Sequence, residues 1–299
     1  MQQGEYRRAI AFVAHTAQAH RQVVGGALLY AWLLSRGAQD VQALRMLDGA
    51  AGIDPDAAPI ARVRELIGPS SALPAGALLA PPLRLAPYAS GVTVPRSARV
   101  AGSAVLLEGG RQALTAAAAL RGTRELWLRN GLGQTAKGRV VEPGPGGSTV
   151  ALIELATALP AGGAASAPRD PFPGSPGSVL VHRPDPTGAA AWPRLHAGFH
   201  GMPDGASAGV RRLGIDVPGP AAVQGAAVFD AGGRWAGVAL TPADGAARVV
   251  MRSALQSLWP RLFPAPLRAG PDAPVAPSAG FDETYERGLR IGLQLIVRS

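Results

Sequence analysis

The sequence predicts a mainly β protein, built as a sandwich or a pair of barrels, that follows a small helical N-terminal region. Residues 4–68 place apolar side chains at helical spacing, whereas residues 91–263 contain short apolar segments separated by Gly, Pro and Asp turns. Glycine and proline account for 39 and 28 of the 299 residues, which favours short strands over long helices. Short strands at this spacing are typical of sandwiches and barrels.

Residues 1–68 are expected to form three or four short helices. Their apolar side chains recur at helical spacing before and after a break near Gly25-Gly26. Asp40 is expected to cap a helix that ends at Asp48-Gly49, and Asp56 to open the next one. Such helices are sufficient for a small packed bundle.

Two Pro-rich segments divide the rest of the chain. Prolines stiffen a connector at residues 69–90, and they recur in a linker at residues 264–280. The expected organisation is a helical region at 1–68, the connector at 69–90, the β region at 91–263, and a linker with a C-terminal tail at 264–299. The expected strands are 98–107, 111–116, 124–129, 137–142, 149–155, 178–182, 210–215, 226–230, 234–240 and 247–251.

The C-terminal tail is expected to be ordered again. Asp282 can cap a helix through Leu289, and apolar residues then alternate over residues 291–297 as in a strand. A tail with this apolar content is expected to dock on its own domain or on a neighbour. The tail and the N-terminal helices are therefore the expected routes to a protein partner or a homo-oligomer.

The composition excludes several classes of function. The formal charge is +9, but the arginines are scattered and the chain has few aromatic residues, at 5 %, so no nucleic-acid partner is expected. The absence of cysteine excludes thiol catalysis, Cys-ligated zinc and disulfides. The longest apolar run, residues 23–34, is too short to span a bilayer, and no transmembrane segment is expected.

The compartment depends on how the chain begins. Residues 1–19 imitate a signal peptide only weakly, because His15 and Thr16 interrupt the apolar patch. The expectation is a periplasmic or secreted protein if a signal peptide has been removed, and a cytoplasmic one otherwise.

Four stretches of the β region occur in the order and at the separations of landmarks in a known family. They are Gly102–Leu107 with Gly109-Gly110 and Leu114–Ala117; Lys137–Val141 with Thr149–Leu155; Pro176–Pro184; and Asp216 with the stretch from Ala222 to Val238. The β region thus resembles the trypsin-like, two-barrel serine protease domain, most closely the bacterial HtrA type. This resemblance implies a trypsin-like double β-barrel at residues 91–263.

The resemblance also implies that all three catalytic positions are substituted. The position of the general base holds Ala118, and that of the nucleophile holds Gln224. The Asp that orients the base is replaced by Thr149, or by Ser148 if the register is shifted by one residue. Alanine accepts no proton and an amide is not a nucleophile at neutral pH, so the triad mechanism is not available.

The turn that would form the oxyanion hole is degenerate as well. Glycines at this turn permit positive φ values, and the resemblance places Ala222 and Ala226 where the family has glycines. The degenerate oxyanion turn therefore comprises Ala222, Val223 and Gly225.

Other candidate sites are weaker. His196 and His200 have the spacing of a zinc-binding helix, but the glutamate is missing and Gly198 disfavours a helix, so no metal is expected. With Asp204 and Ser207 they could form a displaced catalytic triad, although they are interpreted as exposed loop histidines. No cofactor is expected.

The leading hypothesis is a catalytically inactive, HtrA-like pseudoprotease that serves as a binding, scaffolding or assembly module and recognises a protein or peptide. One alternative is an active serine hydrolase that uses residues outside the usual positions. Another is a structural subunit of a filament or envelope complex.

Overall fold

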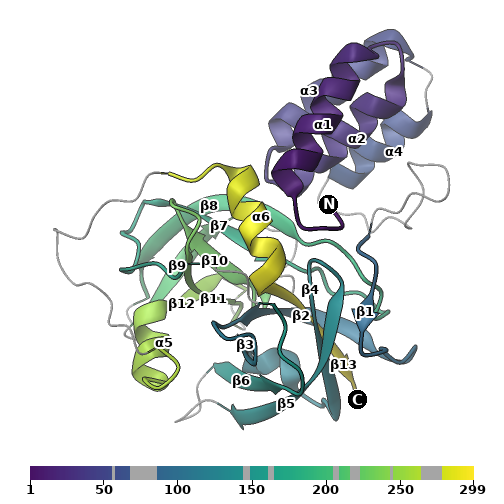
Figure 1. The fold of residues 1–299 in the computed structure, drawn as a ribbon. Helices are drawn as coiled ribbons and strands as arrows, with labels where there is room; N and C mark the ends of the chain where they lie inside the picture. Colours follow the sequence, from purple (N-terminus) through teal and green to yellow (C-terminus); the bar gives the residue numbers. More distant parts are fainter. Residues whose placement is uncertain are drawn as a thin grey trace.

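The computed structural model describes residues 1–55, 58–67, 86–143, 149–160, 165–204, 209–215, 223–242, 245–263 and 278–299. Four helices at the N-terminus form a bundle that stands beside the β region (Figure 1). Their shared core contains Leu28, Ala43, Leu47 and Val63. The helices are α1 Tyr6–Ala19, α2 Val24–Arg36, α3 Asp40–Ile53 and α4 Ala58–Ile67.

The β region consists of two closed barrels of six strands each. In the first, β5 pairs with both β4 and β6, which closes the sheet, and the short β1, Ser90–Gly91, pairs with β5 from outside. The strands of the first barrel are β2 Arg99–Leu106, β3 Gln112–Ala116, β4 Glu125–Asn130, β5 Gln134–Pro143, β6 Val150–Leu155 and β13 Gly292–Arg298.

In the second barrel, the pairing of β10 with β7 closes the ring. Helix α5, Arg252–Leu258, follows its last strand. The strands of the second barrel are β7 Pro176–Val181, β8 Arg194–Pro203, β9 Val210–Ile215, β10 Ala227–Asp230, β11 Trp235–Leu240 and β12 Arg248–Met251.

Both barrels have the same strand order around the ring. The second runs β7-β8-β9-β12-β11-β10, and the first runs β13-β2-β3-β6-β5-β4. In the first barrel, β13, the last strand of the chain, occupies the ring position that β7 occupies in the second barrel. β13 pairs antiparallel with both β2 and β4 and is buried except at its end. The first barrel thus contains residues beyond the 91–263 range assigned to the β region.

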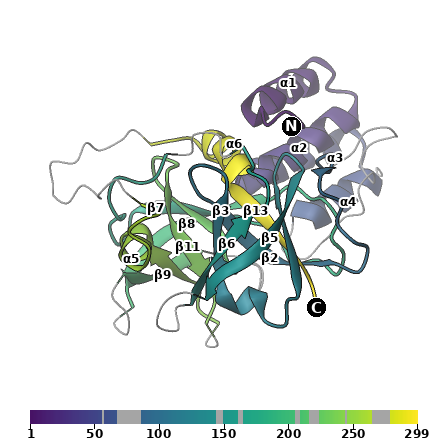
Figure 2. The ribbon, with the colours of Figure 1, turned by 60° about the horizontal axis from the view of Figure 1, so that its bottom comes forward.

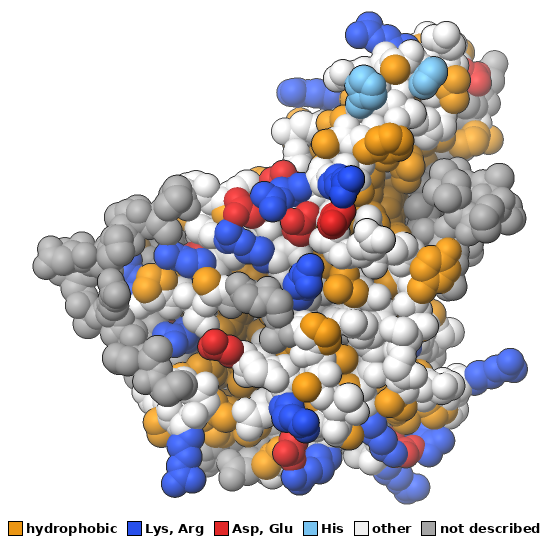
Figure 3. Space-filling model, viewed as in Figure 1, with side chains coloured by type: hydrophobic (Ala, Val, Ile, Leu, Met, Phe, Trp, Pro, Cys, Tyr) orange, Lys and Arg blue, Asp and Glu red, His pale blue; other side chains and the backbone are white. Residues whose placement is uncertain are grey.

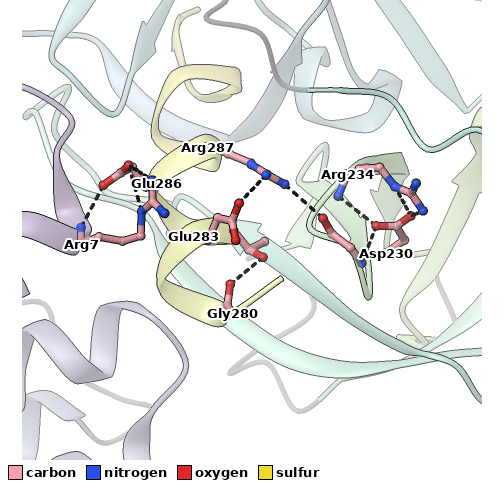
Figure 4. A network of polar contacts seen from close by, with 9 residues as sticks. Arg7, Asp230, Arg234, Gly280, Glu283, Glu286 and Arg287 are labelled. Carbon is pink, nitrogen blue, oxygen red and sulfur yellow. Dashed lines mark hydrogen bonds and ion pairs between the residues drawn. The ribbon is translucent and has the colours of Figure 1, made fainter. Parts of the chain in front are cut away.

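Helix α6, Phe281–Ile291, precedes β13 and lies between the helical bundle and the barrels (Figure 2). Its charged side chains form a band visible on the surface (Figure 3). Glu286 pairs with Arg7 of α1 at 3.1 Å, and Arg287 pairs with Glu283 and donates to the carbonyl of Gly232 at 3.1 Å (Figure 4). Helix α6 therefore contacts the N-terminal bundle on one side and the β10–β11 turn on the other.

The predicted fold class, a mainly β protein with two barrels after a helical region, is confirmed. The predicted end of the third helix at Asp48-Gly49 is wrong, because α3 continues to Ile53 and buries Ala50. Its N-cap is Gln39, with Asp40 in the first turn. Similarly, α6 has Gly280 as its N-cap and holds Asp282 in its first turn. Asp56 and most of the 69–90 connector lie outside the described residues.

Candidate functional site at the junction of the barrels

Ala118 lies just after β3, at one end of the first barrel. Strand β3 continues into a short 3-10 turn, Ala117–Leu120, and Ala118 is exposed on it. The N–H of Ala117 donates to the carbonyl of Thr149 at 2.8 Å. Since β3 and β6 are antiparallel, with Ala116 opposite Val150, the end of one strand meets the start of the other. Ala118 and the exposed Thr149 therefore share one end of the first barrel.

Gln224 belongs to the second barrel, in the turn before β10. Its main-chain carbonyl accepts a hydrogen bond from the N–H of Ser103 in β2, at 3.0 Å. Its side-chain Nε2 donates to the carbonyl of Thr241, just beyond β11, at 2.7 Å. The main chain of this turn is thus bonded to the first barrel, and the amide side chain is held by its own barrel.

Gly225 shows how closely the two barrels approach. Its φ is +76°, and a Cβ there would lie 2.1 Å from the carbonyl oxygen of Ser103 and 2.4 Å from Oγ1 of Thr115. Only glycine satisfies both the left-handed backbone and the contact. Because Thr115 is three residues before Ala118, the Gln224 turn packs against the strand that leads to Ala118.

The remaining residues of the turn are engaged in the fold. The N–H of Gly225 donates to the carbonyl of Ala239 at 2.9 Å, and that of Ala226 to the carbonyl of Val223 at 3.0 Å. The Val223 side chain is buried in the core of the second barrel. These two N–H groups are therefore used internally. Ala222 and Ser148 lie outside the described residues.

The two buried hydroxyl groups that lie beside the Gln224 turn are bound to main-chain groups. Oγ1 of Thr115 donates to the carbonyl of Ser103 at 2.7 Å, and Oγ of Ser103 accepts from the N–H of His182 at 2.8 Å. Both side chains are buried. A serine nucleophile needs a base within hydrogen-bond reach, and neither hydroxyl is paired with one.

His182 is the histidine that the structure brings to this region. It follows β7, is buried, and its Nε2 lies 3.4 Å from the carbonyl oxygen of Gly292 in β13. Burial lowers the pKa of His182 to about 4, despite the bond to Gly292. The ring is therefore neutral near pH 7 and is directed to the main chain of the first barrel.

The interpretation of His196 and His200 as exposed loop residues is wrong. Both lie in β8, where His200 is fully buried with Nε2 3.3 Å from the carbonyl oxygen of Phe229, and His196 is half-buried. Burial lowers the pKa of His200. Residues four apart on a strand are about 13 Å apart, too far to share a metal. No group of three ligating side chains is found among the residues that the structure describes, and Ser207 lies outside them.

No protein-family model and no curated protein matches the chain. Solved structures do. The Rv3671c protease of M. tuberculosis, in an inactive form, is 15% identical with a TM-score of 0.42, over 55% of this chain and 89% of that one. The HtrA-type protease AlgW with a decapeptide is 15% identical with a TM-score of 0.41, over 53% of this chain and 50% of that one.

The MamO protease domain from Magnetospirillum magneticum, in its apo form, is 16% identical with a TM-score of 0.41, over 55% of this chain and 96% of that one. Identities this low concern the fold alone, and no activity is carried over from these proteins.

Among the described residues, none of the helices has the length and apolar character needed to cross a bilayer. The two-barrel architecture of the chain is given by its own strand pairings, and the comparisons with solved structures add no argument to it.

Proposed function

We propose that the protein is a catalytically inactive relative of the trypsin-like proteases and acts as a binding or assembly module, with the junction of its barrels as the peptide-recognition region. The observation that carries this proposal is the state of the Gln224 turn. Its amide side chain is bound to the Thr241 carbonyl, and the next two N–H groups are bound within the barrel. A turn used in this way supplies neither a nucleophile nor these N–H groups to an oxyanion.

The residues around the turn support the same function. Ala118 and Thr149 are exposed at the end of the first barrel to which β3 leads, and they carry no group that titrates near neutral pH. The buried hydroxyl of Ser103 accepts the N–H of His182 and so joins the two barrels, while that of Thr115 bonds within the first barrel. The junction therefore offers a surface of small side chains suited to contact with a peptide main chain.

Serine-reactive labelling tests the loss of catalysis. The purified protein is treated with a fluorophosphonate probe beside an active trypsin-like protease, and the proposal expects no adduct on this chain. It also expects no cleavage of casein or of a mixed peptide library. An adduct, with activity that survives repurification, would establish the alternative of a hydrolase that uses other residues.

Binding is tested separately with peptides selected from a random phage-displayed library on the wild-type protein. Ala118→Trp places a bulky ring on the exposed 3-10 turn and is expected to weaken the selected peptides by about tenfold. Ala61→Trp, at an exposed position of α4, is the matched control and is expected to leave affinity unchanged. Equal affinity for all three proteins would show that the junction is not the recognition region.

A further inference from the structure

The outer face of the second barrel carries a cluster of exposed apolar side chains. Phe199 and Met202 of β8 are 54% and 66% exposed, and Phe172, in the segment before β7, is 60% exposed. Single exposed apolar residues are ordinary, but a group of large ones on one face marks an interaction site.

Backbone hydrogen bonds hold the segment that contains Phe172 beside β8, which contains Phe199 and Met202. Pro176 of β7 lies opposite Phe199. The segment before it continues this pairing, because the N–H of Gly174 donates to the carbonyl of His200 and the N–H of His200 donates to the carbonyl of Ser175. The N–H of Ser175 donates in turn to the carbonyl of Phe172 at 3.0 Å. Phe172 therefore lies beside the part of β8 that carries Phe199 and Met202.

Two glycines make this face flat. A Cβ on Gly214 of β9 would lie 2.3 Å from the ring of Phe199, so the ring rests directly on the Gly214 main chain. Gly201 packs against the start of Arg212: a Cβ on Gly201 would lie 2.8 Å from the Arg212 carbonyl oxygen and 3.0 Å from the Arg212 Cβ. Side chains at these positions would lift both groups away from the sheet. The two glycines thus leave a shallow surface with the ring of Phe199 lying across it.

Arginines surround the apolar side chains. The guanidinium of Arg169 lies 4.8 Å from the ring centroid of Phe172, and Arg211 donates to the carbonyl of Pro171. Arg212 is exposed, and no ion pair of its side chain is recorded among the described residues. We call this surface the basic apolar patch: Phe172, Phe199, Met202, Arg169, Arg211 and Arg212.

Two acidic side chains flank the patch in the sequence, Asp170 and Asp204, and both have partners within the protein. The carboxylate of Asp170 accepts hydrogen bonds from the main chain and the hydroxyl of Ser253, and Asp204 is paired with Arg248. Asp204 is thus neutralised by Arg248 whereas Asp170 keeps its charge, and Arg169, Arg211 and Arg212 together leave the patch with a net positive charge. Guanidinium groups bind carboxylates through paired hydrogen bonds, and arginine and aromatic residues dominate binding hot spots.

We propose that the basic apolar patch is a second binding surface, distinct from the barrel junction, that takes an acidic segment of a partner protein in which carboxylates alternate with aromatic side chains. A protein segment is favoured over an anionic membrane because Phe199 lies flat on Gly214 instead of projecting outward, as insertion into lipid requires. Phe172, Phe199 and Met202 contact the aromatic side chains of the segment, and Arg169, Arg211 and Arg212 bind its carboxylates.

The test uses the full-length protein and fluorescent poly(Glu,Tyr), with poly(Glu) as the probe that lacks aromatic rings. The proposal expects tighter binding of poly(Glu,Tyr) than of poly(Glu). Phe199→Ser with Arg212→Glu is expected to weaken poly(Glu,Tyr) by about tenfold. The matched control, Phe12→Ser with Arg62→Glu on the helical bundle, makes the same changes at exposed positions and is expected to stay within about twofold.

Three results overturn the proposal: no binding of poly(Glu,Tyr) to the wild-type protein, equal weakening in the patch and control variants, or unchanged copolymer binding in the patch variant. If the patch variant binds the copolymer as the wild-type protein does but no longer binds vesicles of phosphatidylglycerol and phosphatidylcholine that the wild-type protein binds, the patch is a membrane-binding surface instead. If the double variant does not fold, Arg212→Gln removes the charge, retains the Cβ that lies beside Gly201 and is expected to weaken copolymer binding about threefold.

Discussion

The rings of Tyr6 and Tyr285 pack with centroids 4.5 Å apart at an interplanar angle of 56°, joining the first helix of the chain to the helix before its last strand. Both side chains are fully buried. The hydroxyl of Tyr6 donates to the carbonyl of Leu33 at 2.7 Å, and that of Tyr285 to the carbonyl of Pro193 at 2.9 Å. This pair therefore links the helical bundle, α6 and the second barrel in one packed unit.

Tyr285→Ala is expected to lower the free energy of unfolding by about 3–5 kcal/mol, because it leaves a large cavity. It also leaves the buried Pro193 carbonyl without its donor. Tyr6→Ala should have a similar effect, and the double variant should cost about 0.5–1.5 kcal/mol less than the sum. Urea unfolding measures all three, with Phe12→Ala, which is 71% exposed, as the control. Strict additivity would show that the rings do not interact.

Acid is expected to destabilise the protein through His182. Its pKa falls from 6.5 to about 4 on folding, so the unfolded chain binds a proton in a range where the folded protein does not. This contribution is fully present above pH 6.5 and is lost as pH falls from 6.5 to about 4, by up to about 3 kcal/mol. Burial lowers the pKa of His200 too, with the same sign.

Urea midpoints measured from about pH 7 to about pH 4.5 follow this loss. His182→Asn removes the titrating group and is expected to flatten the profile over this range. A profile as steep as that of the wild-type protein would show that other groups cause the acid sensitivity.

The strand β13 is expected to be required for the first barrel. Leu295 is fully buried and lies between Gly102 of β2 and Leu128 of β4. Leu295→Ala should lower the free energy of unfolding by about 2–5 kcal/mol. The control is Arg298→Ala, which breaks a partly exposed ion pair with Glu125, leaves Glu125 paired with Lys137 and should cost less than about 1 kcal/mol. Equal effects would indicate that the C-terminal strand is dispensable for barrel stability.

Local patterns predicted much of the β region, because short apolar segments bounded by glycine turns specify strands directly. Strand β8 was missed because Gly198 and Gly201 are typical of a loop. Its glycines are explained by tertiary contacts, since Gly198 packs against Ile215 and Gly201 packs against the main chain and Cβ of Arg212. The alternation at residues 291–297 indicates a strand, but nothing local indicates that it pairs with β2 and β4, which lie far away in the sequence.

The candidate site, too, could be predicted from the sequence only in part. Ala118, Thr149 and Gln224 were selected by resemblance, and their roles remain predictions. The sequence gives no sign that the Gln224 amide is bound to Thr241, because that contact depends on the closure of the second barrel. It also gives no sign that His182 is directed toward Gly292, since this requires the C-terminal strand to complete the first barrel.

Gln224→Ser is expected to leave the protein without hydrolase activity. The change supplies a hydroxyl at the predicted nucleophile position, but Ala118 offers no base, and the buried His182 ring is directed to Gly292. A serine without a base is a poor nucleophile at neutral pH. Fluorophosphonate labelling should therefore stay at the wild-type level in both Gln224→Ser and the control Gln224→Ala. Labelling of the serine variant alone would reveal a base near this turn and contradict the assignment of the junction as catalytically inert.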